Sequence, residues 1–225
     1  MDLDAVSTRL ADLLAPLDTA VVTVRGVPTT VGEVLGFVTG AACVWAVARQ
    51  RLWNWPVGMA NNLLFLALFT GYGLYADAGL QVVFLVLAAY GWWSWLRGGA
   101  GADRLPVTRT TGAQWLGLLA AGVAGTALLH WVLDTQTAST VPLPDAFTTV
   151  LSLLATWGQC RKKVECWYLW IAADLVYVPL YLYKELALTA VLYVGFLALC
   201  VLGLRSWRAD LAAATTPAAP LPVAA

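Results

Sequence analysis

The stretches WAVARQRLWNW (residues 45–55) and WGQCRKKVECW (residues 157–167) decide the fold, because they are two copies of one pattern 112 residues apart. In each copy a Trp is followed four positions later by an Arg and ten positions later by another Trp. Without any gap, the same offset pairs Gly91 with Gly203 and Trp95 with Trp207. Three Trp pairs, an Arg pair and a Gly pair in one register indicate an internal repeat.

The amino-acid composition excludes most classes of soluble protein. Of the 225 residues, 60% are hydrophobic and 12% are charged, about half the share of charge in a soluble domain. Lys and Arg number 13, as do Asp and Glu, so the chain lacks the positive charge that nucleic-acid binding requires. The four cysteines form no CxxC pair, and neither His130 nor a carboxylate stands at metal-ligand spacing beside them. We therefore expect buried apolar thiols, no metal site and an integral membrane protein.

Seven stretches are apolar enough and about long enough to cross a hydrocarbon core of roughly 30 Å. Together they predict an all-α membrane protein in which short loops leave no room for a soluble domain. The expected spans are Val31–Ala48, Pro56–Leu74, Leu80–Leu96, Gly112–Leu133, Asp145–Gln159, Trp167–Tyr183 and Leu186–Leu204.

Basic residues then orient the seven spans, because Lys and Arg are retained on the cytoplasmic side of short loops. One side of the membrane would carry three of the 13 basic residues, namely Arg9, Arg25 and Lys184. The other side would carry the remaining ten, which are Arg49, Arg51, Arg97, Arg104, Arg109, Arg161, Lys162, Lys163, Arg205 and Arg208. This distribution predicts an N-terminus outside the cell and a cytoplasmic C-terminus.

The repeat predicts how the spans are grouped. Each copy, residues 31–97 and 143–209, holds three spans, and a three-span unit reverses its direction across the bilayer. One extra helix at residues 112–133 restores a parallel orientation, which gives a 3+1+3 arrangement with a pseudo-two-fold axis along the membrane normal. Parallel-repeat transporters have this pattern and hold their substrate near the midplane between the repeats.

The two ends of the chain lie outside the repeats. In residues 1–30, apolar residues at positions 3, 6, 10 and 13 recur at helical spacing, so we expect a short interfacial helix there. Residues 210–225 are rich in Ala, Pro and Thr and contain no aromatic residue, so we expect a disordered tail.

The sixth span carries the most distinctive candidate site. Trp167, Trp170 and Asp174 stand at i, i+3 and i+7, which places them on one helix face. Two aromatic rings with a carboxylate one turn deeper can stack a flat ring and bind a polar or cationic group on it. For Trp167 an interfacial aromatic belt is the competing interpretation, because basic residues end just before it.

The corresponding helix of the first repeat carries amides. Asn61 and Asn62 need partners inside an apolar span, and hydrogen bonding between helices is the structural alternative to ligand binding. Gly58 occupies the position that Trp170 fills in the second repeat, which suggests that the first repeat leaves room for a ring. Further candidates for the lining of the site are Gln81, Tyr177, Tyr181 and Tyr193.

The sequence lacks the residue patterns that nucleotide hydrolysis, proton coupling and phosphate binding require. There is no GxxxxGK[ST] loop, no convincing proton-relay chain within the spans and no basic cluster there to hold a phosphate. No pairing of a Ser or Cys with the single His is visible, so we expect no catalytic residues, no cofactor and no enzyme. The sequence indicates passive movement of a small, flat, uncharged or cationic polar molecule.

Five segments carry a family resemblance: WNWPVG (53–58), LYADAGLQ (74–81), YGWWSW (90–95), WYLWIAAD (167–174) and LTAVLY (188–193). They resemble the Pnu-type vitamin transporters, in particular the nicotinamide riboside branch (PnuC-like), over residues 31–209. The resemblance implies the SWEET-like 3+1+3 fold in the cell membrane and a homotrimer. It also implies facilitated diffusion of nicotinamide riboside, followed by trapping by a separate cytosolic kinase.

The resemblance also implies which residues bind the substrate. Trp167 and Trp170 match the WxxWxxxN substrate motif of that family, and Gln81 with the Asn61/Asn62 region matches its polar contacts in the first half. Asp174 departs from the motif, because the nicotinamide riboside pattern has Asn there. A carboxylate favours a cation, so we rank nicotinamide riboside first, thiamine second and neutral riboflavin third.

Overall fold

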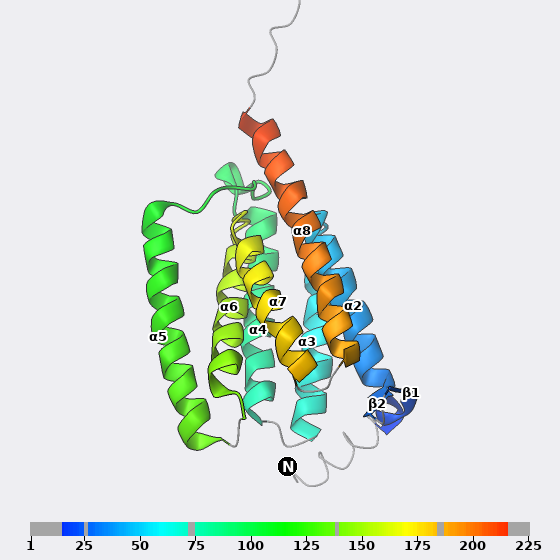
Figure 1. Cartoon of the computed structure of the whole chain (residues 1–225). Helices are drawn as coiled ribbons and strands as arrows, with labels where there is room; N and C mark the ends of the chain where they lie inside the picture. Colours follow the sequence, from blue (N-terminus) through cyan, green and yellow to red (C-terminus); the bar gives the residue numbers. More distant parts are fainter. Residues whose placement is uncertain (1–14, 25–26, 72–74, 138–139, 184–186, 216–225) are drawn as a thin grey trace, which may run out of the picture.

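The computed structural model describes residues 15–24, 27–71, 75–137, 140–183 and 187–215. In these residues, seven α-helices run alternately up and down and form one bundle (Figure 1). Their bounds are α2 Val31–Ala48, α3 Asn54–Gly71, α4 Tyr75–Arg97, α5 Gly112–Gln136, α6 Pro142–Cys160, α7 Cys166–Tyr183 and α8 Ala187–Thr215. Each expected span coincides with one helix, and the bounds of α2 are those expected.

Four helices of the described residues are long and apolar enough to cross a membrane. They are Tyr75–Arg97, Gly112–Gln136, Cys166–Tyr183 and Thr189–Ala214. The apolar part of α2 is shorter, Val34–Ala48, while α3 and α6 are diluted by polar side chains such as Asn61, Asn62 and Ser152. Polar side chains therefore make α3 and α6 less apolar than the four helices that meet the criterion for crossing a membrane.

The C-terminal end of α8 corrects one expectation. Residues 210–215 were expected to be disordered, yet α8 continues through Thr215. The segment ADLAAA (209–214) is rich in Ala, which has the highest intrinsic helix propensity. Leu211 packs against the buried core, and Asp210 Oδ2 accepts a hydrogen bond from Gln50 Nε2 at 2.6 Å. Residues 216–225 lie outside the described part.

The segment before α2 also differs from the all-α expectation. A short 3-10 helix, η1 (Ala15–Asp18), is followed by the antiparallel strands β1 (Ala20–Val24) and β2 (Val27–Thr30). Val and Thr dominate both strands, and β-branched residues favour extended backbone. The interfacial helix expected near the N-terminus falls on residues 1–14, which lie outside the described part.

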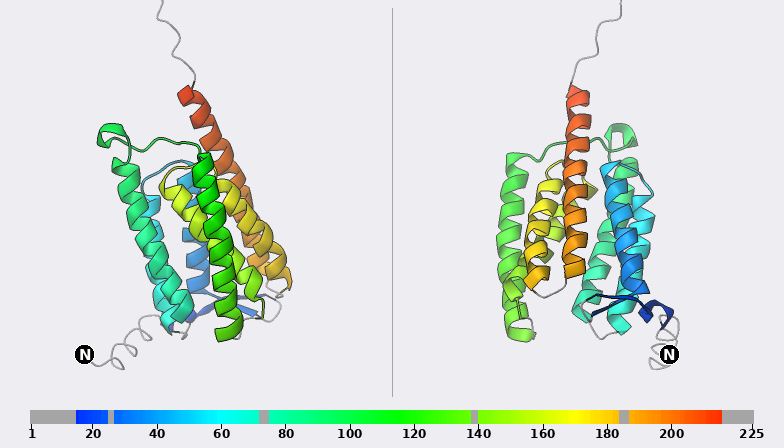
Figure 2. Two further views of the ribbon diagram at one scale, coloured as in Figure 1. Left: turned by 90° about the vertical axis from the view of Figure 1, so that its left-hand side faces the viewer. Right: turned by 45° about the vertical axis from the view of Figure 1, so that its right-hand side comes forward.

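The helices pack in two groups that contact each other twice. In the first group α3 packs on α2 and α4, and in the second group α7 packs on α6 and α8. Between the groups α2 packs on α8, and α4 packs on α6. Helix α5 packs on α6 at one edge of the bundle (Figure 2), and it contributes no buried residue. The two contacts between the groups leave space for a cavity at the centre.

Four tryptophans, Trp55, Trp95, Trp167 and Trp207, form a buried cluster at one end of the bundle; we call them the Trp cluster. Trp55 meets Trp95 edge to face at 5.2 Å between ring centroids, and Trp167 meets Trp207 in the same way at 5.4 Å. Trp95 and Trp207 then contact each other at 5.9 Å. Such edge-to-face pairs add about 0.5–1.5 kcal/mol each to the free energy gained from burying the rings.

Two hydrogen bonds of the Trp cluster cross between the helix groups. Trp95 Nε1 donates to the carbonyl oxygen of Gln159 at 2.9 Å, and Trp207 Nε1 donates to that of Val47 at 3.1 Å. Donors and acceptors are related by the 112-residue offset. Each helix group therefore supplies one indole to the other group's backbone.

Glycines make room for the remaining two rings. A Cβ on Gly91 would lie 2.1 Å from Cη2 of Trp55, and one on Gly203 would lie 2.4 Å from Cη2 of Trp167. No real Cβ tolerates such distances, so only glycine allows each indole to lie against the neighbouring helix. Gly91 and Gly203, which are paired in the sequence repeat, thus do the same thing: each leaves space for an indole ring.

The turns that end α2 and α6 also correspond. Gln50 has φ 51° and Lys162 has φ 46°, both in the left-handed region that non-glycine residues seldom adopt. Lys162 Nζ donates to Gln50 Oε1 at 2.8 Å and lies 4.5 Å from the centroid of Trp95. Burial, assisted by Arg104 and opposed by Asp210, lowers the pKa of Lys162 to about 8. The ammonium group is thus held at the turn after α6 despite a desolvation cost.

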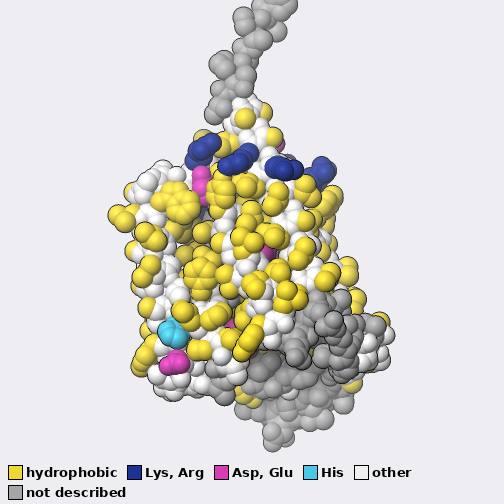
Figure 3. Space-filling model, viewed as in Figure 1, with side chains coloured by type: hydrophobic (Ala, Val, Ile, Leu, Met, Phe, Trp, Pro, Cys, Tyr) yellow, Lys and Arg dark blue, Asp and Glu magenta, His cyan; other side chains and the backbone are white. Residues whose placement is uncertain are grey.

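Basic side chains gather at the end of the bundle that holds the Trp cluster. Figure 3 shows Lys and Arg in a band near the upper end of the face in view, with hydrophobic side chains covering the helices below. Of the ten basic residues assigned above to one side, Arg97 ends α4, two lie in the last part of α8, and the other seven follow α2, α4 or α6. The other three, Arg9, Arg25 and Lys184, lie outside the described residues.

The glycine contact at the Trp cluster generates a stability prediction. Gly203→Ala should lower the stability of the detergent-solubilised protein by about 1–3 kcal/mol, because the indole of Trp167 must move. Gly195→Ala is the matched control in α8, where no described atom apart from the neighbouring backbone of the same helix lies within 4 Å of the added Cβ. The control should leave stability unchanged or raise it, since Ala favours helix over Gly. Thermal unfolding followed by tryptophan fluorescence measures both; equal shifts would contradict the close contact.

Candidate functional site

A cavity of about 500 Å³ lies between the two helix groups and is lined by residues of α2, α3, α4, α6, α7 and α8. The Trp cluster contributes two of its rings, Trp55 and Trp167, to the lining. The volume falls in the range typical of small-molecule sites, roughly 300–1,000 Å³. The mixture of aromatic rings, amides and carboxylates in the wall is suited to a flat polar ligand.

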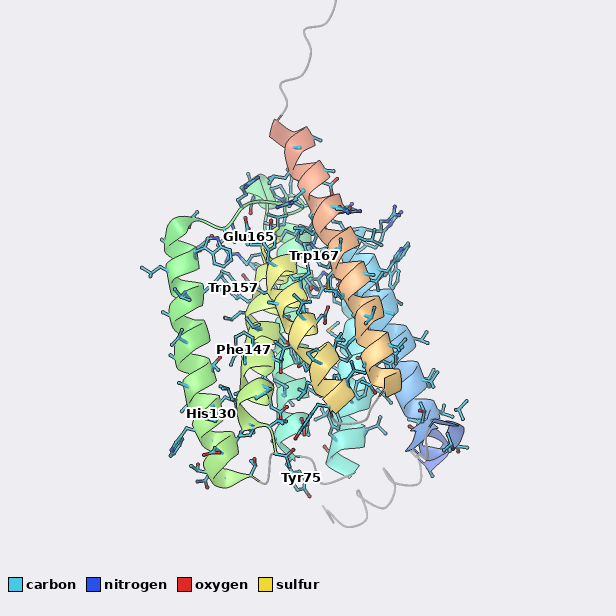
Figure 4. All side chains as sticks on the ribbon, in the orientation of Figure 1. Tyr75, His130, Phe147, Trp157, Glu165 and Trp167 are labelled. Atoms are coloured by element: carbon cyan, nitrogen blue, oxygen red, sulfur yellow. The ribbon has the colours of Figure 1, made fainter. Side chains whose placement is uncertain are left out.

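Helix α7 presents the expected face to this cavity, since Trp167, Trp170 and Asp174 all line it. Trp167 lies near the upper end of α7 (Figure 4) and is only 1% exposed, packed against Trp207. That burial removes it from any lipid-facing aromatic belt. Trp170, one turn further along α7, is half-buried and leaves part of its ring accessible.

Asp174 is the buried carboxylate of the site. It is 4% exposed, and Cys200 Sγ donates a hydrogen bond to its Oδ2 at 3.5 Å. Among the described residues that line the cavity there is no Lys, Arg or His, and His130 lies on α5 at the edge of the bundle (Figure 4). A buried carboxylate with no described protein cation beside it favours a ligand that brings a positive charge or a hydrogen-bond donor.

The two neighbouring amides of α3 have different surroundings. Asn61 Nδ2 donates to Thr39 Oγ1 at 2.6 Å and to the carbonyl oxygen of Gly36 at 3.2 Å, so it ties α3 to α2. Asn61 thus forms hydrogen bonds between helices, which the sequence offered as the alternative to ligand binding. It also lines the cavity. Asn62 and Gly58 also line the cavity, and a Cβ built on Gly58 would lie 3.8 Å from Cys43 Sγ.

The remaining candidates fall into two sets. Gln81 of α4 and the tyrosines Tyr177 and Tyr193 line the cavity. Tyr181 is absent from that lining; its ring stacks on Tyr177 at 5.6 Å and contacts Tyr193 at 4.9 Å. Tyr181 therefore packs against two of the tyrosines that line the cavity.

Sequence reasoning missed several lining residues. Ser152, Thr156 and Gln159 of α6 face the cavity, and their recurrence at helical spacing was the signal that could have found them. Asp77, in the first turn of α4, adds a second carboxylate to the lining. Trp55 also lines the cavity, and its pairing with Trp167 in the sequence repeat was the signal that could have identified it.

Trp55 and Trp167 share an unusual feature. Their Nε1 atoms are buried and find no hydrogen-bond partner among the described residues, in contrast to the bonded Nε1 atoms of Trp95 and Trp207. A buried donor without an acceptor costs about 1–3 kcal/mol. These two buried N–H groups therefore form no hydrogen bond within the described part of the chain.

Comparisons with known proteins find relatives over most of the chain. The family model described as nicotinamide mononucleotide transporter matches residues 30–209. The riboflavin/roseoflavin transporter RibM of Streptomyces davaonensis is 34% identical over 180 residues, which cover 79% of this chain and 82% of that protein. The nicotinamide riboside transporter PnuC of Escherichia coli is 24% identical over 202 residues, covering 78% and 84% of the two chains.

One solved structure matches the fold. It is the crystal structure of the vitamin B3 transporter PnuC, with a TM-score of 0.64 and 22% sequence identity. The match covers 95% of this chain and 93% of that chain. The helical bundle described above is thus the fold of that transporter.

The adjacent amides of α3 provide a matched pair of substitutions. Asn61→Ala should destabilise the protein by about 0.6–1.7 kcal/mol, because it removes hydrogen bonds between α3 and α2. Asn62→Ala should cost clearly less, because none of the described residues makes such a contact with the Asn62 side chain. Thermal unfolding of the two variants in the same detergent makes the comparison, and an equal loss would assign both amides to helix packing.

Proposed function

The chain belongs to the nicotinamide mononucleotide transporter family, and on that premise we propose that it carries nicotinamide riboside across the cell membrane by facilitated diffusion. Its relatives are membrane transporters of vitamins, not enzymes. The observation that carries the proposal is the pairing of Trp170 with Asp174 in a cavity whose described lining has no basic residue. A flat cation can stack on the indole while its charge faces the carboxylate.

The absence of a basic side chain in the described lining favours a vitamin without phosphate. Proteins bind phosphates with Arg or Lys or with the N-terminus of a helix, and a carboxylate repels them. Asp77 and Asp174 both line this cavity. Two carboxylates favour the positively charged riboside over the corresponding mononucleotide, whose phosphate would lie in an acidic environment.

Riboflavin is the second candidate, because the RibM relative is 34% identical to the chain, against 24% for PnuC of Escherichia coli. The neutral flavin ring could stack on Trp170 in the same way and donate its ring N–H to Asp174. The charge argument alone placed thiamine ahead of riboflavin, and the similarity to RibM now reverses that order. The two carboxylates keep nicotinamide riboside in first place.

We propose that the bundle is a 3+1+3 transmembrane arrangement in which all seven helices span the membrane. Helix α2 packs on α8 and α6 packs on α4, which are equivalent contacts under the 112-residue offset. Helix α5, which contributes no buried residue, would be the linker. The crossing hydrogen bonds and the glycine contacts of the Trp cluster support the same pairing. The ten basic residues at one end favour a cytoplasmic location for that end.

Uptake by diffusion also explains why trapping is needed. A passive carrier can only equalise the two concentrations, so net accumulation requires removal of the free vitamin. A separate cytosolic kinase would add a phosphate and so produce a molecule that the acidic cavity does not carry back. We keep the homotrimer as an expectation of the family resemblance.

Asp174→Asn tests the proposed substrate, because it preserves shape and hydrogen bonding while removing the charge. The variant should bind nicotinamide riboside about 5- to 30-fold more weakly, in line with a hydrogen-bonded charge worth roughly 1–2 kcal/mol, whereas riboflavin should be affected less. Isothermal titration of the purified protein with each vitamin measures this. Tighter binding of riboflavin than of nicotinamide riboside by the unmodified protein would move riboflavin to first place.

The passive mechanism predicts behaviour in liposomes. Labelled substrate should reach the same internal concentration with and without proton and sodium gradients, because the described spans hold no evident relay. An ionophore should therefore leave the plateau unchanged. Loss of equilibration itself on collapse of either gradient would show that transport is coupled.

A further inference from the structure

One face of α6 lines the cavity with polar side chains. They recur at i, i+4 and i+7, and they are Ser152, Thr156 and Gln159. The 112-residue offset pairs them with three residues of α2 that also line the cavity, namely Gly40, Val44 and Val47. The second half of the chain therefore offers side-chain hydrogen bonds at three positions where the first half offers none.

Packing between helices does not account for two of these side chains, Thr156 and Gln159. Thr156 Oγ1 donates to the carbonyl oxygen of Ser152 at 2.7 Å, which is a bond within α6 itself. The side-chain amide of Gln159 bonds to no described residue and is not among the sealed polar atoms of the described chain. A polar side chain in an apolar span needs a partner. On this face of α6 the partner must come from the cavity.

The polar face of α6 lies beside Trp170. A Cβ built on Gly158 would lie 3.1 Å from Cβ of Cys166, so α7 begins next to this residue of α6. At about 1.5 Å per residue, Thr156 lies roughly 3 Å from this level, Trp170 roughly 6 Å and Asp174 roughly 12 Å, all in the direction away from the Trp cluster. Side chains lean toward the N-terminus of their own helix, so those of antiparallel α6 and α7 lean toward each other's level.

The proposed cargo has a matching group at this level. In nicotinamide riboside the ribose is attached to the charged ring nitrogen, so a charge near Asp174 keeps the ribose on that side of the ring. The carboxamide stands two ring positions away from the nitrogen, and on a ring stacked on Trp170 it is directed away from Asp174. Its two N–H donors and one carbonyl acceptor then face the end of the cavity where α6 is polar.

We propose that Thr156 and Gln159 bind the carboxamide of the vitamin and thereby select the amide over the corresponding acid. The hydroxyl proton of Thr156 is used within α6, so its oxygen accepts from an amide N–H, while Gln159 both donates and accepts. A carboxylate in place of the carboxamide would have no N–H for either residue. The inference rests on the proposed function, in which the cargo is nicotinamide riboside.

The first test compares two ligands that differ only in the carboxamide, nicotinamide riboside and ribosylpyridinium. Gln159→Leu should weaken binding of nicotinamide riboside about 3- to 10-fold and leave that of ribosylpyridinium unchanged, because only the first ligand loses a hydrogen bond. Isothermal titration of the purified protein measures both. The control is Gln136→Leu, at the exposed end of α5 and outside the cavity lining, which should bind both ligands as the unmodified protein does.

The second test separates hydrogen bonding from packing. Thr156→Val removes the hydroxyl at nearly constant volume and should weaken binding of nicotinamide riboside alone, whereas Thr156→Ser keeps the hydroxyl and should preserve binding. Thr70→Val is the matched control, because Thr70 Oγ1 makes the same kind of bond within its helix, to the carbonyl oxygen of Leu66 at 2.7 Å, but is exposed and does not line the cavity.

Nicotinic acid riboside, which has a carboxylate in place of the carboxamide, measures the selectivity. The unmodified protein should prefer nicotinamide riboside, and Gln159→Leu should narrow that preference. If Gln159→Leu fails to fold in detergent, the two Thr156 variants decide. An equal loss for nicotinamide riboside and ribosylpyridinium, or no loss for either, would overturn the inference while leaving the proposed function standing. Failure of the unmodified protein to bind nicotinamide riboside would overturn both.

Discussion

The structure depends on two hydrogen bonds that cross between the halves of the chain. Trp95 donates to the backbone of Gln159, and Trp207 donates to the backbone of Val47. Trp95 also packs edge to face on Trp55, and Trp207 packs in the same way on Trp167, so these pairs hold the two rings of the Trp cluster that line the cavity. Because both bonds use backbone acceptors, they constrain the positions of whole helices as well as those of the side chains.

Function arises where corresponding positions differ. The 112-residue offset relates Gly58 to Trp170 and Asn62 to Asp174. The first half therefore supplies space and an amide where the second half supplies a ring and a carboxylate. A cavity with two equal halves would favour no orientation of an asymmetric ligand, whereas this one can hold a flat ring against the second half. The shared framework and the unequal lining are thus separate features of the sequence.

Hydropathy predicted the positions of the helices well, because each apolar stretch must be long enough to bury its backbone in a bundle or a membrane. It did not predict the end of α8, where Ala-rich residues 210–215 extend the helix, or the β1–β2 hairpin before α2. Both features follow from local propensity in segments where the hydropathy signal is weak. Composition alone had suggested a tail and an interfacial segment there.

Eight of the nine candidate residues named from the sequence line the cavity, and the ninth, Tyr181, contacts two of them; that they bind a substrate stays a prediction. The sequence did not identify Trp55 or Asp77. Which tryptophans of a repeat face a cavity depends on contacts between helices far apart in the chain, and no local pattern records them. Asp77 stands in the first turn of α4, where a carboxylate ordinarily interacts with the helix dipole and with solvent.

The central claim is that the cavity between the halves accepts the vitamin without its phosphate. Titration of the purified protein with nicotinamide riboside and nicotinamide mononucleotide, and with riboflavin and its monophosphate, tests this most directly. The account predicts that at least one of the two vitamins binds and that its monophosphate binds at least about tenfold more weakly, because two carboxylates and no described basic residue line the cavity. Equal or tighter binding of the monophosphate would contradict it.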